Sequence, residues 1–122
     1  MTYVNSANAP AAIGPYSQAI VANGILFLSG QLGLDPHSMQ LADGIEAQTH
    51  QVLKNIKAVL AADNKNFSNV VKATIFLINM DDFAQVNIIY ADYFGDHRPA
   101  RSCIAVARLP KNALIEIECI AV

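Results

Sequence analysis

The chain has 122 residues, of which 53% are hydrophobic and 15% are charged, and its formal net charge is −2. A chain of this length forms one domain that buries roughly two thirds of its unfolded surface, and no internal repeat divides it. A slightly acidic chain has no electrostatic footprint for nucleic acid or for an anionic membrane. We therefore expect a single domain, residues 1–122, that binds neither.

The cellular compartment is suggested by what the sequence lacks. Its apolar runs are too short to span a bilayer, and residues 1–5 lack the basic and apolar regions of a signal peptide. The two cysteines, Cys103 and Cys119, form neither a disulfide scaffold nor a zinc-binding spacing. We expect a reduced, cytoplasmic protein.

The first third of the chain indicates strands. A short strand is expected at residues 3–4, and apolar runs at 16–22 and 25–30 are separated only by Asn23-Gly24. Because this dipeptide accepts the positive φ angles of a type I′ turn, the two runs are expected to form a hairpin. Turn residues at 35–38 then open a loop that reaches Gly44.

A helix and a strand follow. From residue 45 the apolar side chains recur on one helical face, and polar residues at 63–66 end the helix. The members of this face are Ile45, Val52, Leu53, Ile56, Val59 and Leu60. Residues 70–78 are β-branched and aromatic with little polar interruption, which predicts a strand buried on both faces.

The last third predicts a second helix and two closing strands. Capping residues and acids at 79–82 precede a stripe made of Phe83, Val86, Tyr90 and Phe94. Strands are expected at 102–108 and 114–122. The order is β-β-β-α-β-α-β-β, an α+β fold whose mixed sheet carries both helices on one face.

The final strand suggests that the other face of the sheet is not covered by this chain. Its odd positions, 115 to 121, are apolar or small and suit the helix side, whereas its even positions mix Glu116 and Glu118 with large apolar residues. A half-apolar face without cover predicts self-association. We expect an obligate oligomer with its sites at the subunit interfaces.

Two kinds of role are open for the acids on that face. A partly buried Glu116 or Glu118 could act as a general base for a water molecule. Alternatively, either acid could form a salt bridge between subunits with Arg108 or Arg101.

The stretch 98–103 holds the best candidate for binding an anion. Pro99 cannot continue the preceding helix and a strand starts soon after it, so Arg101 is expected to have a fixed backbone. Its planar guanidinium matches the two oxygens of a carboxylate, although an ordinary surface arginine would look the same in sequence. Cys103 lies on the same side of the strand and is more simply explained as a small buried residue than as a nucleophile.

The remaining polar residues give weaker signals. The three histidines and the acids show no spacing typical of metal ligands, and none of the histidines is marked as a partner for a cysteine. Gly30 could leave a backbone N–H open to a ligand, with hydroxyls from Tyr16 and Ser29 nearby, or it could simply end a strand.

Several spaced motifs together resemble the RidA/YjgF/UK114 family over nearly the whole chain. They are Gly14-Pro15-Tyr16-Ser17-Gln18-Ala19, Leu28-Ser29-Gly30-Gln31, Asp82-Phe83-Ala84-Gln85-Val86-Asn87 with Tyr90, and Pro99-Ala100-Arg101-Ser102-Cys103 followed by Leu109-Pro110 and Ile115-Glu116-Ile117. The resemblance implies a chorismate-mutase-like homotrimer with three clefts between subunits. It also implies hydrolysis of 2-imino acids, such as 2-iminobutanoate and 2-iminopropanoate (2-aminoacrylate), to 2-keto acids and ammonia. Such hydrolysis protects pyridoxal-phosphate enzymes from enamine damage.

The resemblance also implies residue roles, without a cofactor or metal. Arg101 would bind the substrate carboxylate, Glu116 would activate the attacking water, and the backbone of Cys103 would meet the imine nitrogen. Tyr16, Ser29, Gly30 and Asn87 would shape the pocket. Other roles assigned to the family are non-enzymatic: binding of small acids, regulation, or chaperone-like action. RNA cleavage, attached to some relatives, fits an acidic chain poorly.

A simple geometric argument bears on this assignment. If the last two strands formed a tight hairpin near residues 111–112, Arg101 would lie five residues from the position opposite Glu116, roughly 16 Å away. A shared site therefore requires either that these strands are not hairpin neighbours or that the two residues come from different subunits.

Overall fold

The computed structural model describes all 122 residues and has the element order predicted from the sequence. The helices and strands are β1 (Thr2–Val4), β2 (Ala19–Ala22), β3 (Ile25–Leu32), α1 (Gly44–Ala62), β4 (Val70–Leu77), α2 (Phe83–Phe94), β5 (Ala100–Ala105) and β6 (Ile115–Ala121). Short 3₁₀ turns precede β4, α2 and β6. No helix is both long enough and apolar enough to cross a membrane.

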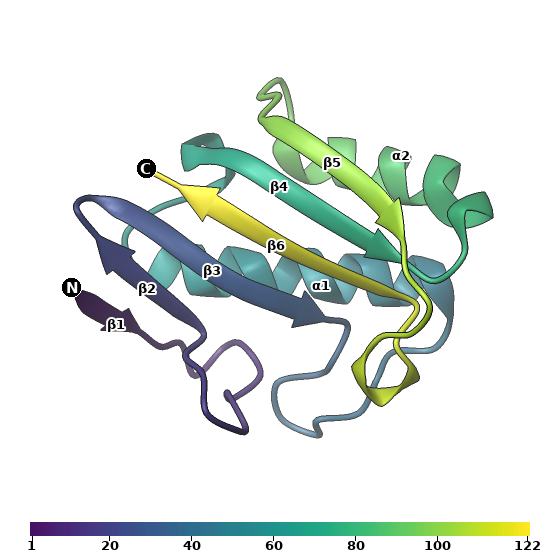
Figure 1. Ribbon diagram of the computed structural model, residues 1–122, viewed down its shortest axis with the longest axis horizontal. Coiled ribbons are helices and arrows are strands. Elements are labelled where there is room, and N and C mark those ends of the chain that lie inside the picture. The colour runs from purple at the N-terminus through teal and green to yellow at the C-terminus, as the bar shows by residue number, and fades with distance from the viewer.

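The six strands form one sheet in the order β1-β2-β3-β6-β4-β5. The strand that comes last in the chain, β6, lies in the middle of the sheet and is antiparallel to both β3 and β4 (Figure 1). The strands β4 and β5 are parallel, because α2 carries the chain back across the sheet between them. The strand β5 is therefore an edge of the sheet and not a hairpin partner of β6.

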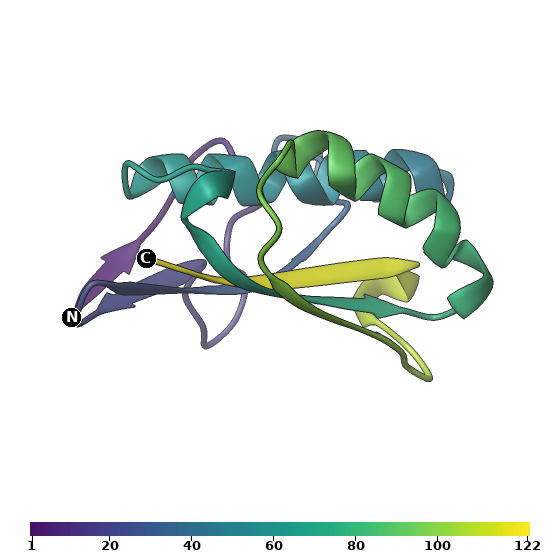
Figure 2. The same ribbon diagram turned by 90° about the horizontal axis from the view of Figure 1, so that it is seen from above.

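Both helices cover the same face of the sheet, as predicted (Figure 2). The helix-facing side chains of β6 are Ile115, Ile117, Cys119 and Ala121, and all four are buried. The opposite face has no cover within the chain, and Phe27 and Ile104 there remain 47% and 46% exposed. The predicted division of the sheet into a covered face and an open face is therefore confirmed.

The strand β4 corrects one expectation. Its helix-facing residues Ala73, Ile75 and Leu77 are fully buried, but the residues between them are only partly buried. Because the chain places both helices on one face, nothing in it covers the other side of β4. The prediction of a strand buried on both faces was therefore wrong for the single chain.

Several strand boundaries differ from those predicted from the sequence. Asn23 (φ 51°) and Gly24 (φ 76°) make the predicted turn, but β2 starts at Ala19, and residues 16–18 belong to the loop before it. Strand β3 continues to Leu32, past the predicted end at Gly30. Strand β5 spans Ala100–Ala105 instead of 102–108, since pairing with β4 stops where β4 ends at Leu77.

Three buried amide side chains hold the loops at one end of the sheet. Gln18 donates to the carbonyls of Ser6 and Pro10 and accepts from the Ser6 N–H, which fixes the N-terminal loop. Gln48 on α1 accepts from the Leu114 N–H at 2.8 Å, just before β6. Asn55, also on α1, donates to the carbonyls of residues 32 and 34, where β3 ends. Residues of these loops line the cavity described below.

Candidate active site, divided between two surfaces

Glu116 lies on the open face of the sheet, while its sequence neighbours Ile115 and Ile117 are buried on the helix-facing side. It is partly buried and has no hydrogen bond or ion pair, since the chain's single ion pair joins Lys65 to Asp63. Burial raises the pKa of the Glu116 carboxyl above its ordinary value, and the neighbouring charge of Glu118 raises it further. A carboxylate with a raised pKa is a stronger base, which suits it to accept a proton from water.

Gly30 makes room for this carboxylate. The register between β3 and β6 shifts after the Leu28–Cys119 pair, so that a β-bulge holds Ser29 and Gly30. The Glu116 side chain lies directly over Gly30, and a Cβ atom built there would be 2.7 Å from the carboxyl carbon. Any side chain at position 30 would therefore displace Glu116.

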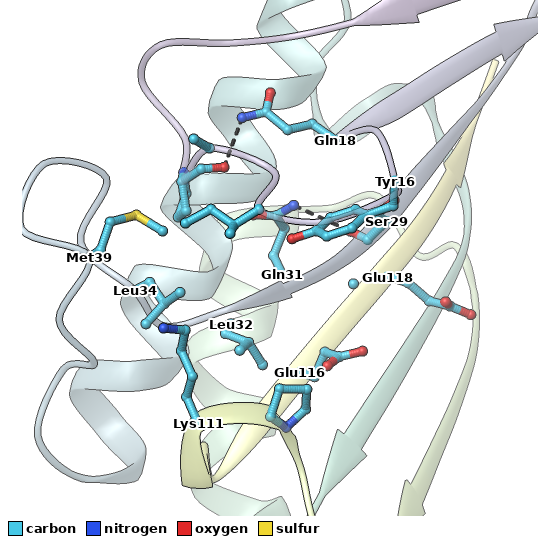
Figure 3. Close-up of a pocket in the computed structure, with 15 residues that line it drawn as sticks. Tyr16, Gln18, Ser29, Gln31, Leu32, Leu34, Met39, Lys111, Glu116 and Glu118 are labelled. Atoms are coloured by element: carbon cyan, nitrogen blue, oxygen red, sulfur yellow. Dashed lines mark hydrogen bonds between the residues drawn. The ribbon is translucent and has the colours of Figure 1, made fainter.

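A cavity of about 570 Å³ opens beside Glu116. Tyr16, Ser29, Gly30 and Glu118 are among the residues that line it. Figure 3 shows Met39 and Lys111 on the side of the cavity away from Glu118. The other lining residues are Pro10, Ala11, Ile13, Gln18, Gln31, Leu32, Leu34 and Pro110. We call this cavity the Glu116 pocket.

Within the Glu116 pocket, the hydroxyl of Ser29 is already engaged. It donates to the Ser17 carbonyl at 2.6 Å, so towards a ligand it can only accept a hydrogen bond. Tyr16 is 54% exposed and carries a free hydroxyl. The pocket thus offers two carboxylates, of which Glu116 is the partly buried one, together with one hydroxyl donor and the backbone of the bulge.

Arg101 lies on the other side of the sheet. It pairs with Ala73 of β4 and shares the helix-facing side of β5 with Cys103. Its Nη1 donates to Asn87 Oδ1 of α2 at 2.7 Å. A second hollow of about 480 Å³, the Arg101 pocket, is lined by Asn87, Tyr90, Ala91, Arg98, Pro99 and Arg101.

The structure thus brings the predicted residues together in two groups, with Tyr16, Ser29, Gly30 and Glu116 in one and Asn87 and Arg101 in the other. Arg101 of β5 pairs with Ala73 of β4, which in turn pairs with Cys119 of β6. Cys119 lies three residues after Glu116 in β6, so Arg101 and Glu116 are two strands apart and offset by three residues. Strand spacing and rise then put the two residues roughly 14 Å apart along the sheet, on opposite faces. Although β5 and β6 are not hairpin neighbours, one chain cannot bring both residues to one small substrate.

The thiol of Cys103 is a poor nucleophile in this setting. It packs against the core, and burial raises its pKa, with only a smaller lowering from Arg101. A protonated thiol is unreactive, so any contribution of Cys103 to a site would come from its backbone.

The histidines have structural contacts. His50 Nδ1 is 3.1 Å from the Tyr93 hydroxyl, and His97 Nε2 is 2.6 Å from the Val70 carbonyl. No three His, Cys, Asp or Glu side chains converge as metal ligands. Neither Glu116 nor Glu118 pairs with Arg101 or Arg108 within the chain.

Sequence reasoning missed two features of the site. The spacing of Phe83 and Tyr90 indicates an ordinary core stripe, yet both rings contact the Arg101 guanidinium. Lys111 belongs by sequence to a connecting loop, yet it lines the Glu116 pocket from a left-handed backbone (φ 58°). For the contacts with Arg101, the only signal in the sequence was the spacing of Phe83 and Tyr90, which lie seven positions apart on one helix face.

Comparison with known proteins gives consistent results over the whole chain. Residues 6–122 match the family model described as endoribonuclease L-PSP. The Arabidopsis thaliana protein named reactive intermediate deaminase A, chloroplastic, is 55% identical over 97% of this chain and 64% of its own length. The Bos taurus protein named 2-iminobutanoate/2-iminopropanoate deaminase is 48% identical over 98% of this chain and 88% of its own length.

Solved structures agree with these relatives. A crystal structure described as a putative endoribonuclease from Thermotoga maritima is 51% identical, with a TM-score of 0.97 over 100% of this chain and 97% of the other. The structure of Escherichia coli TdcF with bound serine is 36% identical, with a TM-score of 0.96 over 100% of this chain and 98% of the other. The predicted mixed sheet with two helices is therefore confirmed by the strand order of this chain and by its structural neighbours.

Proposed function

The chain belongs to the endoribonuclease L-PSP family, and we propose that it hydrolyses reactive 2-imino acids to 2-keto acids and ammonia. The substrates would be 2-iminobutanoate and 2-iminopropanoate, and their removal would protect pyridoxal-phosphate enzymes. The names of relatives at 48–55% identity support this activity. The structural observation that carries it is the partly buried, unpaired carboxylate of Glu116, whose pKa is raised and which lies over Gly30 at the rim of a cavity.

The reaction follows from these groups. The carboxylate of Glu116 takes a proton from water as the water oxygen bonds to the imine carbon, which turns the C=N bond into a C–N bond. The imine reacts in its protonated form, so the tetrahedral adduct carries an amino group and a hydroxyl on the same carbon. Glu116 returns the proton to nitrogen, and ammonia leaves with the electrons of the C–N bond while the hydroxyl oxygen forms the carbonyl double bond. The Glu116 carboxylate takes the hydroxyl proton and passes it to the departing ammonia, so that the 2-keto acid remains and the carboxylate is regenerated.

Arg101 would hold the substrate carboxylate while this happens. A hydrogen bond to a charged group contributes about 1.5–3 kcal/mol, and orientation lowers the barrier further. We propose that Cys103 contributes its backbone at the imine nitrogen, and that Tyr16, Ser29, Gly30 and Asn87 shape the pocket. The imine carbon is already electrophilic, so the proposal needs no cofactor.

Within one chain, Arg101 and Glu116 are too far apart to hold one small substrate, so the proposal requires a second copy of the chain. We expect a homotrimer in which the Arg101 pocket of one subunit faces the Glu116 pocket of the next. The uncovered sheet face, with Phe27 and Ile104 exposed, supports association of this kind. A cytoplasmic location stays a prediction, since one relative is named as chloroplastic.

The test generates 2-iminobutanoate in situ with a pyridoxal-phosphate dehydratase and follows release of 2-oxobutanoate. The wild-type protein should accelerate this release. Glu116→Gln should lose about 10²–10⁴-fold in rate while it still binds 2-oxobutanoate, and Arg101→Ala should lose both binding and turnover. If the wild-type protein gives no acceleration over buffer, the enzymatic proposal is wrong.

A second candidate function is binding of small acids without catalysis. The serine bound in the Escherichia coli neighbour is the observation that favours it. Under this alternative, wild type and Glu116→Gln would bind 2-oxo acids equally well and neither would turn over an imino acid. Calorimetry on both proteins, beside the activity assay, separates the two functions.

A further inference from the structure

Arg101 needs outside support if it is to hold a carboxylate in one place. It lies on the edge strand β5 and is exposed, so β5 itself packs little against the side chain. An arginine side chain loses rotamer entropy when it is immobilised. Contacts that already fix the guanidinium in the free protein remove part of that cost from substrate binding.

Helix α2 supplies such contacts. The Arg101 guanidinium carbon is 5.3 Å from the centre of the Phe83 ring and 4.9 Å from the centre of the Tyr90 ring. Asn87 lies between these two residues in sequence and accepts a hydrogen bond from Nη1. Residues 83, 87 and 90 follow the i, i+4, i+7 spacing, so all three lie on one helical face. We call Phe83 and Tyr90 the aromatic cradle.

The geometry leaves the binding edge of the arginine free. Asn87 takes one N–H of Nη1, and the Arg101 side chain makes no other hydrogen bond in the chain. An arginine has five N–H donors, so enough remain for a carboxylate to accept two parallel bonds. The rings act on the face of the guanidinium and do not compete for its donors.

Tyr90 takes part through its ring and not through its hydroxyl. The side chain is 5% exposed and stacks on Phe94 at 4.3 Å, and its hydroxyl has no hydrogen-bond partner. Phenylalanine at this position would therefore keep the stacking and lose no hydrogen bond.

We propose that Phe83 and Tyr90 are positioning residues for Arg101, which hold its guanidinium ready for the substrate carboxylate. This inference rests on the proposed function, in which Arg101 binds that carboxylate. Because the cradle acts before chemistry begins, its loss weakens substrate binding and leaves the proton transfers at Glu116 unchanged.

The experiment compares Phe83→Leu and Tyr90→Leu with the aromatic replacements Phe83→Tyr and Tyr90→Phe. Each leucine variant should raise KM for the imino acid and Kd for 2-oxobutanoate by about 2- to 5-fold, with kcat nearly unchanged. The aromatic variants should stay close to wild type. The control is Phe67→Leu, since Phe67 is a buried ring that packs on Tyr93 and Phe94 and not on Arg101.

Two results would overturn the inference. One is that Phe83→Leu and Tyr90→Leu leave KM and Kd unchanged. The other is that Phe67→Leu raises both by as much as the cradle variants do, because the effect would then come from general loosening of α2.

The cradle can also be tested when the proposed function fails. If wild type neither turns over imino acids nor binds 2-oxobutanoate, that function is wrong. Urea unfolding of Phe83→Leu, Arg101→Met and the double variant still measures their coupling. The cradle predicts coupling of about 2- to 5-fold in the unfolding equilibrium constant, and additive effects would contradict it.

Discussion

At the scale of single residues, two glycines near the end of β3 have opposite roles. A Cβ atom at Gly30 meets the movable end of Glu116, whereas one at Gly33 would lie 2.8 Å from the backbone of Gln48 on α1. The first neighbour can swing aside and the second cannot. A larger residue at position 30 would therefore disturb the site, whereas one at position 33 would disturb the packing of α1 on the sheet.

Gly30→Ala should reduce turnover by at least about 10-fold while the urea midpoint stays near that of wild type, because it displaces the base without disturbing the core. Gly33→Ala should do the reverse and lower stability by about 1–3 kcal/mol through a backbone clash. Keto-acid release and urea unfolding, measured on both variants, check this. Full activity in Gly30→Ala would show that the position of Glu116 over Gly30 does not matter.

A second residue-scale prediction concerns pH. Glu116 must be ionised to act as a base, so activity falls as pH drops through its raised pKa. Glu118→Gln removes the like charge that helps to raise this pKa, and it should move the acidic limb of the kcat profile to lower pH. Glu46→Gln, at the start of α1, should leave the limb in place. A limb that stays unchanged in Glu118→Gln would show that the charge of Glu118 does not raise the pKa of the group that sets the limb.

At the scale of elements, Asn55 ties α1 to the end of β3. It is fully buried, and its Nδ2 donates to the carbonyls of Leu32 (3.0 Å) and Leu34 (2.9 Å). Asn55→Ala leaves both acceptors without this donor and should lower the free energy of unfolding by about 2–4 kcal/mol. Gln51→Ala removes only the partner of the Asn55 oxygen and should cost less. Urea unfolding at one protein concentration compares them, and equal losses would argue against the two carbonyl bonds.

Elements with strong local signals were predictable from sequence. The Asn23-Gly24 turn and the helical periodicity of α1 and α2 depend on neighbouring residues, so the sequence displays them directly. The place of β6 between β3 and β4 does not depend on neighbouring residues, because the partner strands are distant in the chain. The alternation of apolar and polar residues indicates which face of a strand is buried but not which strand pairs with it. For the same reason, a run of apolar residues in β4 could not reveal which of its faces a helix would cover.

The candidate site shows the same limit more sharply. Motifs nominated Arg101 and Glu116, and alternation correctly put Glu116 on the open face. The contacts of Arg101 with Phe83 and Tyr90 were hidden, because aromatic residues at helical spacing normally indicate a core. Only the pairing of residues between β4, β5 and β6 revealed that Arg101 and Glu116 of one chain lie on opposite faces of the sheet.

At the scale of the whole molecule, the divided site makes a prediction about mixtures. Arg101→Ala and Glu116→Gln should each be inactive alone, but co-refolded together they should recover about a quarter of wild-type activity, since one interface in four pairs an intact arginine with an intact acid. The measurement is keto-acid release from the refolded mixture.

The control mixes Arg101→Ala with the double variant Arg101→Ala/Glu116→Gln, which contains no intact arginine and should stay inactive. If the first mixture also stays inactive although both variants assemble, the two residues do not meet across an interface.

The central place of β6 also bears on synthesis. Strands β3 and β4 leave the ribosome well before β6 does, and each keeps an unpaired edge until β6 is inserted between them. The nascent chain can form the β2–β3 hairpin and helix α1, but it cannot close its sheet. The sheet therefore cannot close until β6 has emerged, and until then the edges of β3 and β4 are open to pairing with other chains.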